Sequence, residues 1–413
     1  MNATDRFDIA VGLVLSKDAE PPRRLIENIS TGLSTYFSSF RWTLIHTHTG
    51  LSRRQRPPEL LGLDNQIPVS VPWAGIQHVT FPWHGLPAKT AGYQAILTQA
   101  ERVGAAASLI VDPTEEGFEP DWVDSLLRPG LHSRYDLVTP VHPEQPDQRM
   151  ISANLISPLL AGLFGAAPRE PMSGTFLVSE KLRRRLLSRR DWESASARYV
   201  PELWINFSAA AEGYRRAEAF VGQSRSSASA AILPPHVALI QIIESVFTLM
   251  EQYEGRWRSG KSADPLDQFG REQRMLPAFA GSADGLEYLV KFVNAYVALA
   301  EQWRSILDPH TFHAIDTFHS SLRAGDTEAM LADKTWVRVV YELAGSWKCR
   351  VRPRHQLAGL FVPLYWARIG SLLLKNRWTD QAGPTSQLRS LGNYFQGMRP
   401  ALDRLWAGQK EAA

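Results

Sequence analysis

The sequence predicts an α/β domain with a mostly parallel sheet, followed by an all-α domain. Strand-like and helix-like segments alternate through the first half of the chain, an order typical of a parallel sheet covered by helices on both faces. From Pro235 to the end, apolar residues recur at helical spacing. The chain of 413 residues is also longer than a domain built around a single hydrophobic core, so two domains are expected. We place the boundary near residue 232, after the polar run 224–229, which gives domains 1–232 and 233–413.

The elements of the first domain follow from apolar runs and helical periodicity. Residues 8–15 are an apolar run typical of a buried strand, and 21–36 carry apolar residues at helical spacing. A short helix at 122–128 is expected to stop at Pro129-Gly130. The other expected elements are strands at 42–46, 107–111, 135–139, 174–178 and 217–221, and helices within 86–104, at 152–164 and across the basic segment that follows residue 178.

The second domain is expected to contain helices joined by loops. Apolar residues recur three and four positions apart, which gives each helix one apolar face. These faces are either satisfied within the domain or join two copies of the chain in a homodimer. The expected helices are 236–257, 285–307, 336–347 and 355–374, and the expected loops are 262–282 and 380–384.

Composition predicts a soluble cytoplasmic protein. Apolar residues make up 44% of the chain and charged residues 21%, with a formal net charge of +3. Cys349 is the single cysteine, which excludes an internal disulfide framework and fits a reducing compartment. The N-terminus lacks the pattern of a signal peptide. The longest apolar run, 357–374, is interrupted by Pro363 and Arg368, so no membrane span is expected.

Basic residues are clustered at 183–185 and at 189–190. In helical context such a cluster is typical of a solvated helix face. A nucleic-acid interface calls for a more basic domain with aromatic side chains among the charges. We therefore expect no nucleic-acid partner.

The run 109–116 is the most informative part of the sequence. An apolar, strand-like segment ends abruptly at Asp112, and Glu115 and Glu116 follow. Ligands of open α/β sheets bind beyond the carboxyl ends of the strands, so a carboxylate at this place suggests a binding site. The ordinary alternative is that Asp112 caps the turn that follows the strand.

Several short segments repeat, in order, the landmarks of a known family. They are LPAKT (86–90), VDPT (111–114), FEPDW (118–122), YDLVTP (135–140), REPMSGTF (169–176), ELW (202–204), AEGYR (211–215), WVRVVY (336–341) and PLYWAR (363–368). Together they resemble bacterial family-2-like glycosyltransferases of the mannosylglycerate or glucosylglycerate synthase type. The resemblance implies a GT-A domain, the Rossmann-like fold of nucleotide-diphospho-sugar transferases, followed by a helical C-terminal domain.

The resemblance also assigns site positions. Lys89 aligns with a family lysine ahead of a helix, Asp112 with the first acid of Asp-x-Asp, and Glu202 with an acid before Leu/Ile-Trp. The resemblance then implies Lys89 and Glu202 as catalytic residues. The implied donor-binding residues are Ser16, Lys17, His46, His48, Lys89, Asp112, Thr114, Gly174, Thr175 and Arg225.

Several of these positions depart from the family pattern. The family's Pro-Ser-Tyr-Asn reads Leu-Ser-Lys-Asp at 15–18, its Asp-rich turn reads His-Thr-His-Thr-Gly at 46–50, and its late His-Asp falls at 223–226. The second acid of Asp-x-Asp is Thr114, and the acid of Gly-Gly-Asp is Thr175. A divalent cation, Mg²⁺ or Mn²⁺, is implied at Asp112, and we expect its affinity to be poor because few charged ligands remain.

Cations are expected to replace the missing metal charge on a diphosphate. Lys89 is the first candidate and Arg225 the second, because a guanidinium binds phosphate oxygens bidentately. In an inverting enzyme Glu202 is expected to deprotonate the acceptor hydroxyl, and in a retaining enzyme to help hold sugar and acceptor hydroxyls; the ordinary alternative is a surface acid at a helix start. His46 and His48 lie two residues apart on a strand end, but no third ligand for zinc is apparent.

Two functions of different classes follow. The first is a glycosyltransferase that moves a hexose from a nucleotide-diphosphate sugar to a small polar acceptor, such as glycerate or a sugar acid. The second is a non-catalytic GT-A protein that acts in binding or assembly, since fold alone does not imply activity. A nucleotidyltransferase ranks third, because no Gly-rich signature follows the first strand.

Overall fold

The computed structural model describes residues 7–14, 22–48, 66–70, 86–143, 150–222, 225–226, 235–259, 266–271, 282–326, 328–374 and 384–408. The chain divides into two compact units. Unit 1 comprises Met1–Pro143, Glu170–Pro234 and Leu266–Arg274, and unit 2 comprises Glu144–Arg169, Pro235–Pro265 and Met275–Ala413. The expected boundary near residue 232 lies beside Pro234, where the chain enters unit 2. A single boundary does not separate the two units completely. The segment 144–169 precedes the boundary but belongs to unit 2, and the segment 266–274 follows it but belongs to unit 1.

Unit 1 is built on a mostly parallel sheet, as predicted. Its eight described strands follow the order β10-β8-β6-β7-β4-β1-β2-β3, and β7 alone among them runs antiparallel to its neighbours. All five residues of β1 are buried, as expected for a parallel strand covered on both faces. The strands are β1 Ile9–Leu13, β2 Trp42–His48, β3 Gln66–Ser70, β4 Ala107–Val111, β6 Leu137–Val141, β7 Phe176–Ser179, β8 Arg216–Phe220 and β10 Asp267–Phe269.

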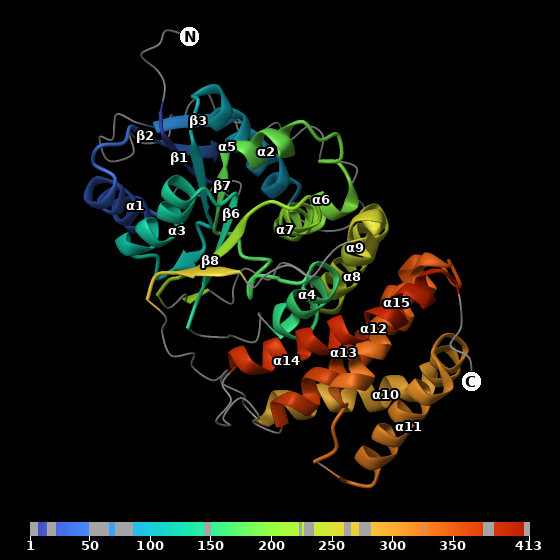
Figure 1. Ribbon diagram of the computed structural model, residues 1–413. Helices are drawn as coiled ribbons and strands as arrows, with labels where there is room; N and C mark the ends of the chain where they lie inside the picture. The colour runs from blue at the N-terminus through green and yellow to red at the C-terminus, as the bar shows by residue number, and fades with distance from the viewer. Residues whose placement is uncertain are drawn as a thin grey trace. The chain divides into compact units, whose positions relative to one another are not determined.

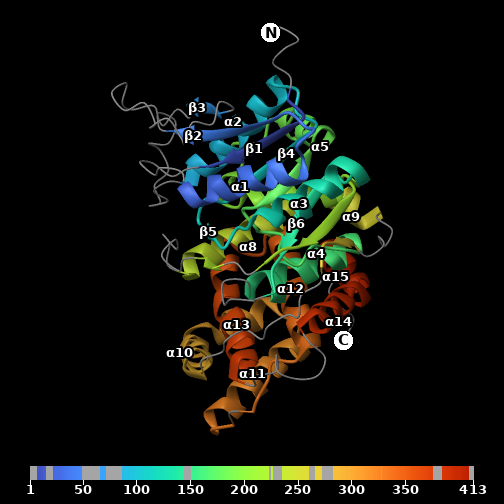
Figure 2. The ribbon, with the colours of Figure 1, turned by 90° about the vertical axis from the view of Figure 1, so that its left-hand side faces the viewer.

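Helices cover both faces of this sheet (Figures 1 and 2). The helices α1 (Arg23–Tyr36) and α3 (Pro120–Ser133) share one core with Ile9, Val11 and Leu13 of β1. The opposite face carries α2 (Leu86–Arg102), where Gly12 allows close packing, since a Cβ there would lie 2.3 Å from Ile96 Cγ2. The remaining elements of unit 1 are α5 Glu180–Leu187, α6 Ala195–Tyr199, α7 Pro201–Ala211 and a small antiparallel pair formed by β5 Glu115–Glu116 and β9 Arg225–Ser226.

The expected stop at the end of the short helix 122–128 is wrong. The helix α3 continues through Pro129 and ends only where Arg134 adopts a left-handed φ of 58°. Pro129 is buried, and a Cβ on Gly130 would lie 2.5 Å from Leu177 Cδ2, so the helix packs tightly on β7. Burial of this face outweighs the backbone hydrogen bond that a proline removes.

Arg184, Arg185 and Arg190 of the basic segment are exposed, as a solvated helix face predicts, but Arg183 and one expected loop differ from their predictions. Arg183 is buried and not solvated; its guanidinium donates to Ser108 Oγ at 3.1 Å and to Glu101 Oε2 at 2.9 Å. These two acceptors satisfy a charge that the sequence pattern alone would place in water. The expected loop 262–282 contains β10, a short and largely exposed edge strand that pairs with β8 through its backbone.

The regular elements that the structure describes in unit 2 are all helices, which confirms the predicted helical region. Buried indoles anchor several of its helices, because each N–H needs an acceptor: Trp336 Nε1 donates to Asn154 O at 2.7 Å, and Trp303 Nε1 to Leu360 O at 3.0 Å. The elements are the π-helix η3 Ser152–Ile156 and the helices α4 Ser157–Phe164, α8 Pro235–Gln252, α9 Glu254–Ser259, α10 Ser282–Ile306, α11 Pro309–Arg323, α12 Asp333–Lys348, α13 Arg354–Leu374, α14 Pro384–Gly397 and α15 Arg399–Trp406.

One helix among the described residues, α13, is long and apolar enough to cross a membrane by length and composition. However, 78% of its apolar window is buried inside the protein. Arg368 on this helix is buried as well, where it donates to Leu331 O at 2.9 Å and pairs with Asp333 at 2.5 Å. This burial is typical of a core helix.

A buried carboxylate holds the start of α11. Glu342 Oε2 on α12 accepts the backbone N–H of Asp308 at 2.8 Å, and Oε1 accepts the Thr311 hydroxyl at 2.6 Å. Burial raises the pKa of Glu342 to about 7, against the opposing effect of these hydrogen bonds and of Arg338. Over the range from its ordinary value to about 7, the folded protein therefore binds more protons at this site than the unfolded chain.

We predict a pH-dependent effect of Glu342→Gln. A raised carboxyl pKa makes stability fall as pH rises from about 4.5 to about 7, and glutamine removes this dependence. The free energy of unfolding of the variant, relative to wild type, should rise by up to roughly 3 kcal/mol across that window. Urea denaturation at intervals between pH 4.5 and 8 measures it. If the free energies of unfolding of the two proteins change with pH in the same way, the raised pKa of Glu342 is contradicted.

Candidate functional site

Asp112 lies directly after β4 and organises the turn that follows. Its Oδ1 accepts the backbone N–H of Thr114 at 2.9 Å and the Thr114 hydroxyl at 2.7 Å, which is the geometry of an Asx turn. Its own backbone N–H donates to Thr175 Oγ1 at 3.0 Å. Thr114 and Thr175 therefore both contact Asp112.

Gly174 is the point of closest approach to this carboxylate. A Cβ at position 174 would lie 2.3 Å from Asp112 Oδ2 and 3.0 Å from its Cγ. Any side chain at 174 would displace Asp112 from its turn. Glycine is thus required here by space, since no left-handed φ is involved.

Lys89 joins Asp112 to Glu202 of α7. The Lys89 ammonium lies 2.5 Å from Glu202 Oε1 and 3.6 Å from Asp112 Oδ2. Tyr93, one turn further along α2, donates its hydroxyl to the same Glu202 oxygen at 2.6 Å. The Glu202 side chain is only 5% exposed, so its interpretation as a surface acid at a helix start is wrong.

Electrostatics fix the protonation states of this cluster. Burial lowers the pKa of Lys89, but Glu202 and then Asp112 outweigh this effect and raise that pKa above its ordinary value, so the ammonium stays charged. Burial, reinforced by Glu202 and Asp112, raises the pKa of Tyr93 well above its ordinary value. The phenol therefore keeps its proton and acts as a hydrogen-bond donor.

A second network of buried polar side chains begins at Thr175. Its hydroxyl donates to Glu115 Oε2 at 2.7 Å, and Glu115 Oε1 lies 3.1 Å from His142 Nε2. The other ring nitrogen of His142 lies 2.9 Å from Glu170 Oε2. The His142 side chain is 1% exposed. The imidazole is therefore enclosed between two carboxyl groups and shielded from water.

Three residues of this site are absent from the sequence-based predictions. Tyr93 has a usable signal, because it follows Lys89 by one helical turn and so shares its face of α2. His142 follows the last residue of β6, where a polar side chain after a buried strand indicates a site. Glu170 is paired with His142 through the fold alone.

Other predicted site residues lie at or near the same edge of the sheet. His46 is buried on β2 and, through Leu13, is in register with Val111 two strands away. The strand β9 pairs Arg225 with Glu116 through the backbone. The structure describes only the backbone of Arg225 and His48, and Ser16 and Lys17 lie outside the described residues. The site roles of all four stay predictions.

The implied divalent cation does not fit the described donor set. In the part of the chain that the structure describes, no three His, Cys, Asp or Glu side chains are grouped to hold a metal ion. Asp112 offers one carboxylate, which is already engaged by Lys89 and Thr114. Glu115 accepts from Thr175 and contacts His142 instead. An ammonium, and not a set of hard oxygen ligands, therefore neutralises the strand-end acid.

Comparisons with known proteins give only distant structural likenesses. No protein-family model matches the chain, and no curated protein does. Glucosyl-3-phosphoglycerate synthase from Mycobacterium tuberculosis, solved with phosphoglyceric acid, aligns over 60% of this chain and 80% of its own, with 16% identity and a TM-score of 0.40. The same enzyme solved with Mn²⁺, UDP-glucose and phosphoglyceric acid gives 16% identity and a TM-score of 0.41 over the same shares. A mycobacterial protein gives 16% and 0.41 over 60% of this chain and 75% of its own. Likenesses at this level carry no conclusion about activity.

Gly174→Ala should destabilise the protein. The new Cβ displaces Asp112 from the hydrogen bonds of its turn, which we expect to cost about 1–2 kcal/mol of unfolding free energy. Gly359→Ala is the matched control, because nothing lies within 4 Å of that Cβ on α13. The control should be neutral or stabilising by up to about 1 kcal/mol. Urea denaturation compares the two, and equal stabilities would remove the steric role of Gly174.

Lys89→Met should leave Glu202 buried without its cation. We expect a loss of about 3 kcal/mol, and a coupling of about 1–3 kcal/mol with Glu202→Gln in a double-mutant cycle. Lys181→Met is the control: that ammonium lies 3.8 Å from Asp136 but its side chain is 73% exposed, so the loss should stay below about 1 kcal/mol. Additive effects of the Lys89 and Glu202 variants would show that the pair does not interact.

Proposed function

We propose that this chain is a cytoplasmic glycosyltransferase that moves a hexose from a nucleotide-diphosphate sugar to a small polar acceptor such as glycerate or a sugar acid. The observation that carries the proposal is the meeting of Lys89, Asp112 and Glu202 beyond the end of β4. These residues are far apart in the sequence, and the family resemblance assigns each of them to the site. Their place at the carboxyl end of a central strand is where open α/β sheets bind ligands.

Lys89 is proposed to bind the diphosphate. Transfer of the hexose leaves negative charge on the departing nucleoside diphosphate, and a fixed cation stabilises that charge. The raised pKa of Lys89 keeps its ammonium available for this role at neutral pH. Arg225, whose backbone pairs with Glu116, is proposed as the second cation.

Glu202 is proposed as the base that accepts the proton of the acceptor hydroxyl. A carboxylate gains proton affinity when a neighbouring cation is withdrawn. As the diphosphate attracts the Lys89 ammonium, Glu202 loses part of its ion pair, and its carboxylate is released to accept the proton of the acceptor hydroxyl. Tyr93 holds the same carboxylate oxygen and fixes its orientation during this exchange.

The non-catalytic alternative is favoured by the charge balance of the cluster. One ammonium faces two carboxylates, Asp112 and Glu202, so an incoming diphosphate meets net negative charge unless Arg225 compensates. The low exposure of Glu202 also restricts an acceptor's access to it. A protein of this kind binds a donor or partner without turnover.

Donor binding is the first test. Thermal unfolding is measured with UDP-glucose, GDP-mannose and ADP-glucose, each with Mn²⁺ and with EDTA. We expect one donor to raise Tm under both conditions, because a ligand at 100 times its Kd stabilises the native state by about 2.7 kcal/mol. Lys89→Met should weaken this binding at least tenfold (about 1.4 kcal/mol), while Lys181→Met leaves it unchanged. Unaltered affinity in Lys89→Met would remove Lys89 from the donor site.

Turnover separates the two functions. Wild-type protein with glycerate and the stabilising donor should release nucleoside diphosphate, and Glu202→Gln should slow release while donor affinity persists. Binding without release favours the non-catalytic protein. If none of the donors shifts the unfolding temperature and none is consumed, the glycosyltransferase proposal is wrong.

A further inference from the structure

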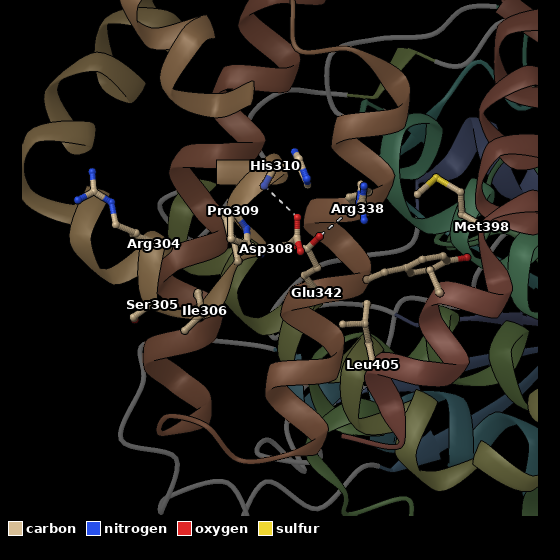
Figure 3. Close-up of a pocket in the computed structure, with 13 residues that line it drawn as sticks. Arg304, Ser305, Ile306, Asp308, Pro309, His310, Arg338, Glu342, Met398 and Leu405 are labelled. Carbon is tan, nitrogen blue, oxygen red and sulfur yellow. Dashed lines mark hydrogen bonds and ion pairs between the residues drawn. The ribbon is translucent and has the colours of Figure 1, made fainter. Parts of the chain in front are cut away.

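A separate cavity lies within the helical unit (Figure 3). It is formed by the end of α10, the start of α11, and the helices α12 and α15. Its volume is about 430 Å³, within the range of small-molecule sites. All of its lining residues belong to unit 2, so an inference from this cavity does not depend on the function proposed for the Lys89 cluster.

One part of the cavity wall is apolar. Ile306 is the last residue of α10 and Leu307 follows it, Met398 directly precedes α15, and Leu405 lies on that helix. Tyr341 also lines the wall, and its hydroxyl is committed to Phe395 O at 2.6 Å. The cavity therefore offers hydrocarbon and ring surface to the body of a ligand, and unbranched Met side chains adapt to different shapes.

The acidic groups on the wall are committed to the protein itself. Asp308 caps α11 by accepting the backbone N–H of His310 at 2.9 Å. Glu342 accepts from the Asp308 backbone and from the Thr311 hydroxyl. Both carboxylates thus accept hydrogen bonds from groups at the start of α11, where the backbone N–H groups carry partial positive charge.

Arg338 and His310 line the same part of the cavity. Arg338 Nε lies 3.6 Å from Glu342 Oε1, and its side chain is 22% exposed (Figure 3). His310 stands in the first turn of α11, exposed and also on the wall. Because burial raises the pKa of Glu342 to about 7, this carboxyl offsets the Arg338 charge only in part near neutral pH. The wall therefore combines an apolar surface with the guanidinium of Arg338.

We propose that this cavity binds a small amphipathic anion, with its apolar body against Met398 and Leu405 and its carboxylate, sulfonate or phosphate group toward Arg338 and His310. A guanidinium binds such a group bidentately. The ligand class is thus an aromatic or aliphatic acid of the size of one or two rings.

The probe is 8-anilinonaphthalene-1-sulfonate, which joins an aromatic body to one anionic group. Its fluorescence is titrated with the full-length protein and with three variants, each checked for folding by its near-ultraviolet circular dichroism and thermal unfolding. Arg338→Gln removes the charge, Ala401→Phe on α15 fills the cavity, and Lys334→Gln on α12 is the matched control outside the lining. Inorganic phosphate is tested as a competitor that carries an anionic group but no apolar part.

We expect saturable binding of one dye molecule per chain to the wild-type protein. Arg338→Gln and Ala401→Phe should each weaken the affinity about fivefold or more, the effect of losing one charge-assisted contact or the space itself. Lys334→Gln should bind like wild type, and phosphate should compete only weakly. Absence of saturable binding, or equal affinity in wild type and folded Ala401→Phe, overturns the proposal. If Arg338→Gln binds the dye as tightly as the wild-type protein does, the proposal that Arg338 binds the anionic group of the ligand is wrong.

Discussion

The ion pair that Lys89 shares between Glu202 and Asp112 is the constraint on which the candidate site depends. A buried carboxylate requires a cation or hydrogen-bond donors, and Glu202 receives both from one face of α2. The same ammonium reaches the acid at the end of β4, so a single charge ties two helices to the central strand. The site can exist only while these three segments keep their spacing.

The fold was largely readable from the sequence because its signals are local. The buried apolar runs of β1 and β4 and the helical periodicity of α1, α10 and α12 predict those elements directly. Predictions failed where tertiary packing overrode a local rule. Pro129 lies inside α3 because its face is buried on β7, and Arg183 is buried because Glu101 and Ser108 accept from it.

The site could be predicted only in part, because its contacts join residues that lie far apart in the sequence. Resemblance to a family singled out Lys89, Asp112, Thr175 and Glu202, which the structure brings together. Nothing in the spacing of the chain indicates that Glu170 pairs with His142, or that Gly174 must be small to admit Asp112. Such pairings depend on how loops close over the strand ends. A pattern confined to a few neighbouring residues carries no information about them.

The imidazole of His142, enclosed by Glu115 and Glu170, has a consequence for any spectroscopic study of this protein. Both ring nitrogens face carboxyl oxygens, at 3.1 Å from Glu115 and 2.9 Å from Glu170, and the ring has almost no contact with water. A nuclear magnetic resonance signal of the His142 ring would therefore report on the two glutamates as well as on the histidine. Isotope-edited carboxyl spectra of both glutamates would have to accompany it before the charge on the ring is assigned.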